Sequence, residues 1–141
     1  MNIEAFVLCD AATESGGKLN VLGAFDTVFA RELPVVHPFC AVALRLRFER
    51  IEEGEHKVRI SFVEEDGKNV LPPLDGAVNI HFAPGQPSAC ANLILNLSGV
   101  KFPKFGQCSI DLALDGRFEK SLPLFVRQMP AAGGQQQAGG N

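Results

Sequence analysis

The chain has 141 residues, of which 46% are hydrophobic and 21% charged, and its formal net charge is −3. This length and hydrophobic content fit one domain that buries a core without disulfides or metals. The mild negative charge argues against a nucleic-acid binder, which needs a basic face, and no apolar run approaches the ~20 residues that cross a bilayer.

Short runs of alternating apolar and polar residues recur along the chain, separated by Gly, Pro, Asn and Asp, without sustained helical periodicity. They predict strands at Ile3–Cys9, Leu19–Ala30, Phe39–Arg50, His56–Glu65, Ala77–Phe82, Cys90–Ser98, Gln107–Leu114 and Phe118–Arg127, with Asn69–Leu71 as a candidate ninth. Closely spaced strands of this kind favour an all-β fold. We expect an antiparallel β-sandwich of about eight strands, immunoglobulin-like or C2-like.

The alternation predicts which side chains face the core. The first strand is apolar on both faces and should therefore be central or covered. The third and fourth strands each have one apolar face, made by Cys40, Val42, Leu44, Leu46 and Phe48 in one and by Val58, Ile60 and Phe62 in the other.

The loop that contains Gly54 predicts a hairpin of the third and fourth strands. Matching their apolar faces sets Leu46 opposite Ile60 and forces Arg45, Arg47, Lys57 and Arg59 together on the outer face. Such a patch is either an ordinary solvated surface or a site for an anion or an acidic partner.

The pair Asp115-Gly116 predicts a second hairpin. A two-residue turn would mismatch the faces of the flanking strands, so we expect a three-residue loop with Gly116 at positive φ.

Residues 1–127 are predicted to form the sandwich domain. The Gln-, Gly- and Ala-rich segment 128–141 has no apolar periodicity and is expected to be a flexible tail.

The candidates for chemistry are weak. His37 and Cys40 have an H-x-x-C spacing, but a structural metal site needs two more ligands. The four cysteines, Cys9, Cys40, Cys90 and Cys108, are scattered, and at least three of them look inward. Together with an N-terminus unlike a signal peptide, this pattern predicts reduced thiols in the cytoplasm, no disulfide, no metal and no cofactor. No catalytic motif is present, and we expect no enzyme activity.

Two segments resemble a known family. They are Glu4–Asp10 followed by Gly17–Asp26, and Gly106–Ile110 followed by Asp115-Gly116 and Leu122–Leu124. They are similar to the opening and closing strands of a family of short bacterial proteins known only as a domain of unknown function. The resemblance implies a β-sandwich in a bacterial cytosol and assigns no catalytic residue. The family more often has an aromatic residue at position 108, which implies a core position for Cys108.

The sequence therefore favours a non-enzymatic binding or protein-interaction module, with an unknown protein partner or self-association through an edge strand or a sheet face. The alternative is a small anionic-ligand-binding protein that uses the basic face. Neither nucleic acid nor membrane is expected as a partner.

Overall fold

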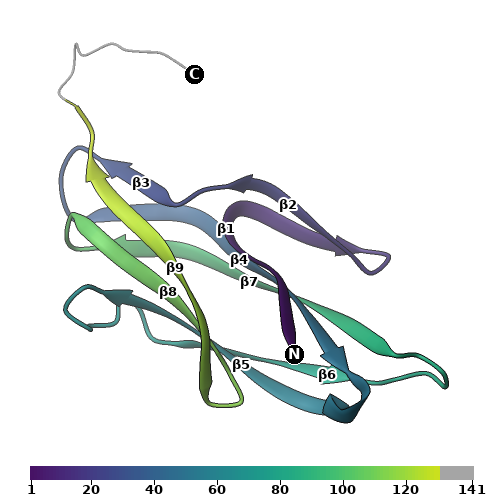
Figure 1. Cartoon of the computed structure of the whole chain (residues 1–141). Coiled ribbons are helices and arrows are strands. Elements are labelled where there is room, and N and C mark those ends of the chain that lie inside the picture. The colour runs from purple at the N-terminus through teal and green to yellow at the C-terminus, as the bar shows by residue number, and fades with distance from the viewer. Residues whose placement is uncertain (131–141) are drawn as a thin grey trace.

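The computed structural model describes residues 1–130, which fold into two packed β-sheets (Figure 1). The predicted β-sandwich is confirmed. Its elements are β1 (Asn2–Ser15), β2 (Lys18–Ala24), β3 (Thr27–Ala30), β4 (Val35–Glu49), the 3₁₀ turn η1 (Arg50–Glu52), β5 (Gly54–Glu64), β6 (Leu74–Ile80), β7 (Ser88–Phe102), β8 (Gly106–Leu114) and β9 (Arg117–Gln128).

One sheet has four strands in the order β2-β1-β4-β7, and the other has five in the order β3-β9-β8-β5-β6. The predicted inward faces are confirmed, since Leu46, Val58, Ile60 and Phe62 are all at most 1% exposed. As expected, β1 is central and pairs with both β2 and β4. The core therefore lies between the sheets, where the apolar faces of the strands meet.

The predicted hairpin of the third and fourth strands is wrong. β4 pairs with β1 and β7, whereas β5 pairs with β6 and β8 in the other sheet. The turn η1 carries the chain from one sheet to the other between them. Two apolar faces can meet side by side in one sheet or across the core, and the alternation pattern fits both arrangements equally well.

The predicted strand Leu19–Ala30 is two strands. The chain leaves the four-stranded sheet after Ala24, and β3 joins the other sheet as a parallel neighbour of β9. Figure 1 shows β2 and β3 following one another along one side of the sandwich.

The turn at Asp115-Gly116 has two residues rather than the three we expect from the sequence. Gly116 has the predicted positive φ, 81°, but Asp115 adopts φ 51° as well, and Leu114 pairs directly with Arg117. A bulge next to Leu112 and Ala113 then restores the match between apolar faces. The extra residue that keeps the apolar faces in register lies in β9 and not in the turn.

The predicted domain boundary falls one residue before the end of β9, because Gln128 still belongs to that strand. Met129 also donates its backbone N–H to the Ala30 carbonyl. The rest of the predicted tail, residues 131–141, lies outside the described residues.

Candidate interaction surface

The hairpin of β1 and β2 folds over the outer face of its own sheet. Cys9, Ala41 and Ala43 are fully buried there although they face away from the main core, and Leu19 and Ile94 pack against them. Small alanine side chains on β4 allow this close approach. The outer face of the four-stranded sheet is therefore partly covered by the chain itself.

A polar cluster centred on Glu4 lies beside this covered region. Glu4 on β1 accepts hydrogen bonds from Arg45 and Arg47, its neighbours on β4. The Cys90 thiol on β7 also donates to the Glu4 carboxylate, over 3.3 Å. The Arg47 hydrogen bond, followed by those of Cys90 and Arg45, lowers the pKa of Glu4 to about 2. Glu4 thus holds a full negative charge between the two arginines.

The cluster continues to the edge strand through Asn92 on β7. Its side-chain carbonyl accepts from Arg45 over 3.1 Å, and its amide donates to Glu14 and to the Gly17 carbonyl, each over 3.2 Å. These contacts fix the tip of the β1–β2 hairpin above β7.

The predicted basic patch does not form as one surface. Arg45 and Arg47 lie on β4, whereas Lys57 and Arg59 lie on β5 in the other sheet. Arg59 instead makes a two-pronged pair with Asp75 on β6, over 2.8 and 3.2 Å. Three of the four predicted side chains are therefore engaged by carboxylates, and the geometric basis for an anion site is gone.

The exposed edge of β7 is the most distinctive feature of the four-stranded sheet. β7 has 15 residues and pairs with β4 on one side. Among residues 1–130, no strand hydrogen-bonds to its other side. No residue from Ser88 to Val100 is charged, and none is a proline.

The direction of the β7 backbone groups follows from the ladder. The Leu8 carbonyl on β1 accepts from Phe25, so Leu8 points away from β4. Leu8 and Val42 are therefore a pair without mutual hydrogen bonds, and the backbone groups of Val42 also point away from β1, toward β7. There Val42 exchanges hydrogen bonds with Leu95, and along β7 the direction of the backbone groups alternates from residue to residue. It follows that Asn92, Ile94 and Asn96 direct their backbone N–H and C=O groups to the open edge.

Residues 4–127 match the sequence profile of DUF6941, a family of unknown function. The chain belongs to this family. No curated protein matches it. The family membership agrees with the resemblance seen in the sequence and brings no assigned activity.

In this family member, His56 and Asp115 resemble a catalytic pair, but neither nitrogen of the His56 ring is free. His56 Nδ1 lies 2.7 Å from Asp115 Oδ2, and His56 Nε2 contacts the Glu52 carbonyl. Burial lowers the pKa of His56, but the hydrogen bonds to Glu52 and Asp115 outweigh burial and raise it. With an acceptor at each nitrogen, both ring nitrogens are engaged within the protein, and these contacts favour the protonated ring.

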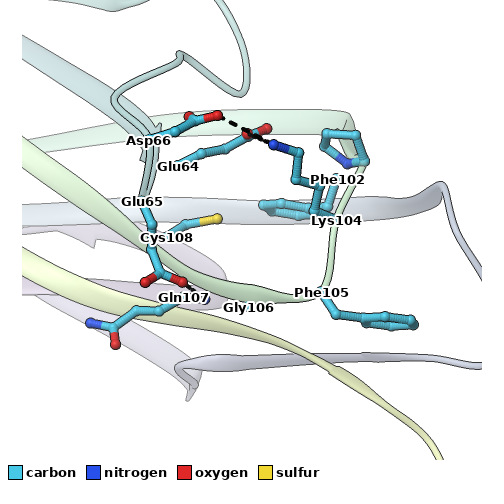
Figure 2. A pocket seen from close by; sticks show the side chains of 10 residues that line it. Glu64, Glu65, Asp66, Phe102, Lys104, Phe105, Gly106, Gln107 and Cys108 are labelled. Carbon is cyan, nitrogen blue, oxygen red and sulfur yellow. Dashed lines mark hydrogen bonds and ion pairs between the residues drawn. The ribbon is translucent and has the colours of Figure 1, made fainter.

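A small hollow lies where β5 and β7 end and β8 begins, and Figure 2 shows its lining. Lys104 Nζ lies 3.2 Å from Asp66 and 3.5 Å from Glu64, and Glu65 accepts from the Gln107 backbone. The hollow measures about 130 Å³, well below the roughly 300–1,000 Å³ of typical small-molecule sites. Burial, reinforced by Glu64 and Glu65, raises the pKa of the Cys108 thiol, which makes it a poor nucleophile.

The thiols and metal candidates offer no alternative site. Cys9, Cys40 and Cys108 are buried as the sequence predicts, and all four cysteines are free thiols. His37 packs against the Phe25 ring, with centroids 5.4 Å apart. Within the described part of the chain, no three His, Cys, Asp or Glu side chains gather as metal ligands. Nor does that part contain a helix long and apolar enough to span a membrane.

The edge of β7 is the feature that sequence reasoning missed. The strand itself is predicted, and its lack of charge is visible in the sequence. Its position at the edge of the sheet depends on strand order, which alternation does not encode.

Proposed function

We propose that this protein is a non-enzymatic interaction module that binds an extended segment of a protein partner by adding a strand to the free edge of β7. The observation that carries this proposal is the long run of the edge, Ser88–Val100, that has neither charge nor proline. Soluble proteins usually protect such edges with lysine, proline, bulges or very short strands. An unprotected edge is suited to strand addition, in which backbone hydrogen bonds supply the affinity.

The other candidate sites support a role without catalysis. The His56 ring has no free nitrogen, Cys108 is buried with a raised pKa, and the hollow beside it is small. The four free thiols support the proposal of a reducing compartment such as the cytoplasm.

The proposal is tested by affinity capture from the native host with three baits. These are the wild-type protein, Asn96→Lys on the β7 edge, and Asn20→Lys on β2, the opposite edge of the same sheet. Both asparagines are exposed, so either substitution should leave the fold intact. We expect a partner identified by mass spectrometry to be retained by the wild type and Asn20→Lys and lost from Asn96→Lys. Equal capture by all three baits would contradict strand addition at β7.

A further inference from the structure

The edge of β7 contains a short palindrome. Its central residues read Asn92-Leu93-Ile94-Leu95-Asn96, the same in both directions. An antiparallel strand presents its sequence in reverse, so a second copy of this segment would place like residues opposite one another. A closed dimer requires this kind of self-complementary surface.

We propose that two copies of this protein pair through β7 in antiparallel fashion, about a two-fold axis that passes beside Ile94. This inference rests on the proposed strand addition and names the partner as a second copy. The two four-stranded sheets would then join into one continuous sheet.

The direction of the backbone groups fits this register. Asn92, Ile94 and Asn96 point to the open edge, as derived from the ladder with β4. With Ile94 beside the axis, Ile94 bonds with its counterpart, and Asn92 bonds with Asn96 of the second copy. The palindrome and the hydrogen-bonding positions therefore select the same register.

The side chains also match across this junction. On the inner face Leu93 meets Leu95 of the second copy, which continues the core, since both leucines are only half-buried in one copy. On the outer face Asn96 is exposed and can donate to the Asn92 carbonyl oxygen, which accepts one bond from Arg45 and retains a lone pair. No like charges oppose one another along the uncharged run Ser88–Val100.

The test begins with sedimentation velocity over a concentration series. We expect the wild type and Asn20→Lys to form a dimer, and Asn96→Lys to remain a monomer. In the dimer, the introduced lysine would lie opposite Asn92 of the other copy, beside both the Arg45 and the Glu14 that Asn92 contacts, and would replace the Asn96 amide that donates across the junction. A lysine on a strand edge also opposes strand addition. Circular dichroism melts of all three proteins show whether the folds are equally stable, so that a monomer is not mistaken for an unfolded chain.

The register is tested with Ser98→Cys, because the proposed pairing sets Ser98 opposite the native Cys90 of the other copy. Residues opposed in a hydrogen-bonded pair have Cα atoms ~5.5 Å apart, within the range of a disulfide. Within one strand the same two positions are eight residues, or roughly 26 Å, apart. We expect mild oxidation to give a cross-linked dimer for Ser98→Cys and none for Ser98→Cys with Cys90→Ser.

The outcomes separate this inference from the function on which it rests. A wild type that stays monomeric at every concentration would overturn the dimer and leave an edge-dependent foreign partner to the capture experiment. A dimer that Asn96→Lys does not weaken would overturn pairing through β7, because it would use another surface, and would likewise leave a foreign partner to the capture experiment. A dimer that is lost in Asn96→Lys without the Cys90-dependent cross-link would overturn the register.

Discussion

The exposed strand edges differ between the two sides of the sandwich, one formed by β3 and β9 and the other by β7. On one side, β3 has 4 residues and pairs with the end of β9, and no other strand within residues 1–130 pairs with that edge of β9. The Phe125 N–H points to this edge, where it donates to the Asp26 carbonyl. Pro123, two residues earlier, faces the same edge, and it has no N–H to donate. On the other side, the edge of β7 runs without charge or proline from Ser88 to Val100, and its one lysine, Lys101, comes only near the end of the strand.

The difference shows where pairing is blocked and where it is left open. The β9 side also has a bulge opposite Leu112 and Ala113, which distorts the strand before Pro123. An apolar hollow of about 430 Å³, lined in part by Phe6, Phe25 and Pro123, opens there. Proline and bulges are common protections against unwanted strand addition. They are present beside this hollow and absent from β7, which at 15 residues is also much longer than the other edge strands β2, β3 and β6. β7 is therefore the edge best suited to a partner.

The largest expected effect comes from proline substitutions that distinguish the two sides of β7 itself. Ala91 pairs with Leu46, and its N–H points into the ladder with β4. Ala91→Pro should cost about 3 kcal/mol or more, because it removes a ladder bond and forces the ring against the neighbouring strand.

Asn96→Pro should instead leave the stability of the monomer nearly unchanged, since its N–H points to the open edge. Thermal melts of both variants measure the contrast. Equal destabilisation would show that the assigned backbone directions are wrong.

A second large effect concerns the core on which both sides rest. Leu46 is 1% exposed, and Leu46→Ala should cost about 2–5 kcal/mol through lost burial and the cavity left behind. Leu22→Ala on β2 is the control, because Leu22 is 70% exposed. Its cost should stay below about 0.5 kcal/mol in the same urea titration. Similar costs for the two variants would contradict the assigned core.

The sequence predicts which face of each strand lies in the core, but it does not predict which strands are neighbours. Alternation places Leu46, Ile60 and Phe62 inside, and all three are buried. It cannot tell whether Leu46 and Ile60 are neighbours in one sheet or face each other across the core, because both arrangements bury the same atoms. The predicted basic patch fails for this reason alone.

The polar cluster and the open edge depend on strand order in the same way. Glu4 meets Arg45 and Arg47 because β1 lies beside β4, a pairing between distant parts of the chain. The uncharged run in β7 is visible in the sequence, but it would be ordinary in a central strand. Its significance appears only once β7 is known to end the sheet.

A smaller effect is expected from pH, and it should affect folding without affecting assembly. His56 has a pKa raised above its ordinary 6.5, so its contacts stabilise the fold fully below that pH. The contribution is lost as the pH rises through the raised value. Denaturant titrations from mildly acidic to mildly alkaline pH should show the decline, and His56→Gln should abolish it.

Dimerisation through β7 should not follow the same titration, because Ser88–Val100 contains no Asp, Glu, His, Lys or Arg. Sedimentation at the same pH values makes this comparison. If the dimer dissociated over the same pH range in which His56 loses its proton, the dimer contact would lie near the Asp115 turn instead of β7.

The smallest effect is expected at Pro123. Pro123→Ala restores an N–H that points away from the sheet, so stability should change by less than about 0.5 kcal/mol. The double variant Pro123→Ala with Asn96→Lys should stay monomeric, because the bulge and the short β3 still protect the β9 edge. A new dimer in this double variant would show that Pro123 is the main protection of the β9 edge.

The central claim, that β7 pairs with another strand in the functioning protein, is tested most directly by residue-resolved hydrogen exchange. The amides of Leu93 and Leu95 bond to β4 and should be protected at every protein concentration. The amides of Asn92, Ile94 and Asn96 should become equally protected at high concentration and lose that protection on dilution or in Asn96→Lys. Rapid exchange of these three amides at every concentration, and in the presence of any captured partner, would contradict the account.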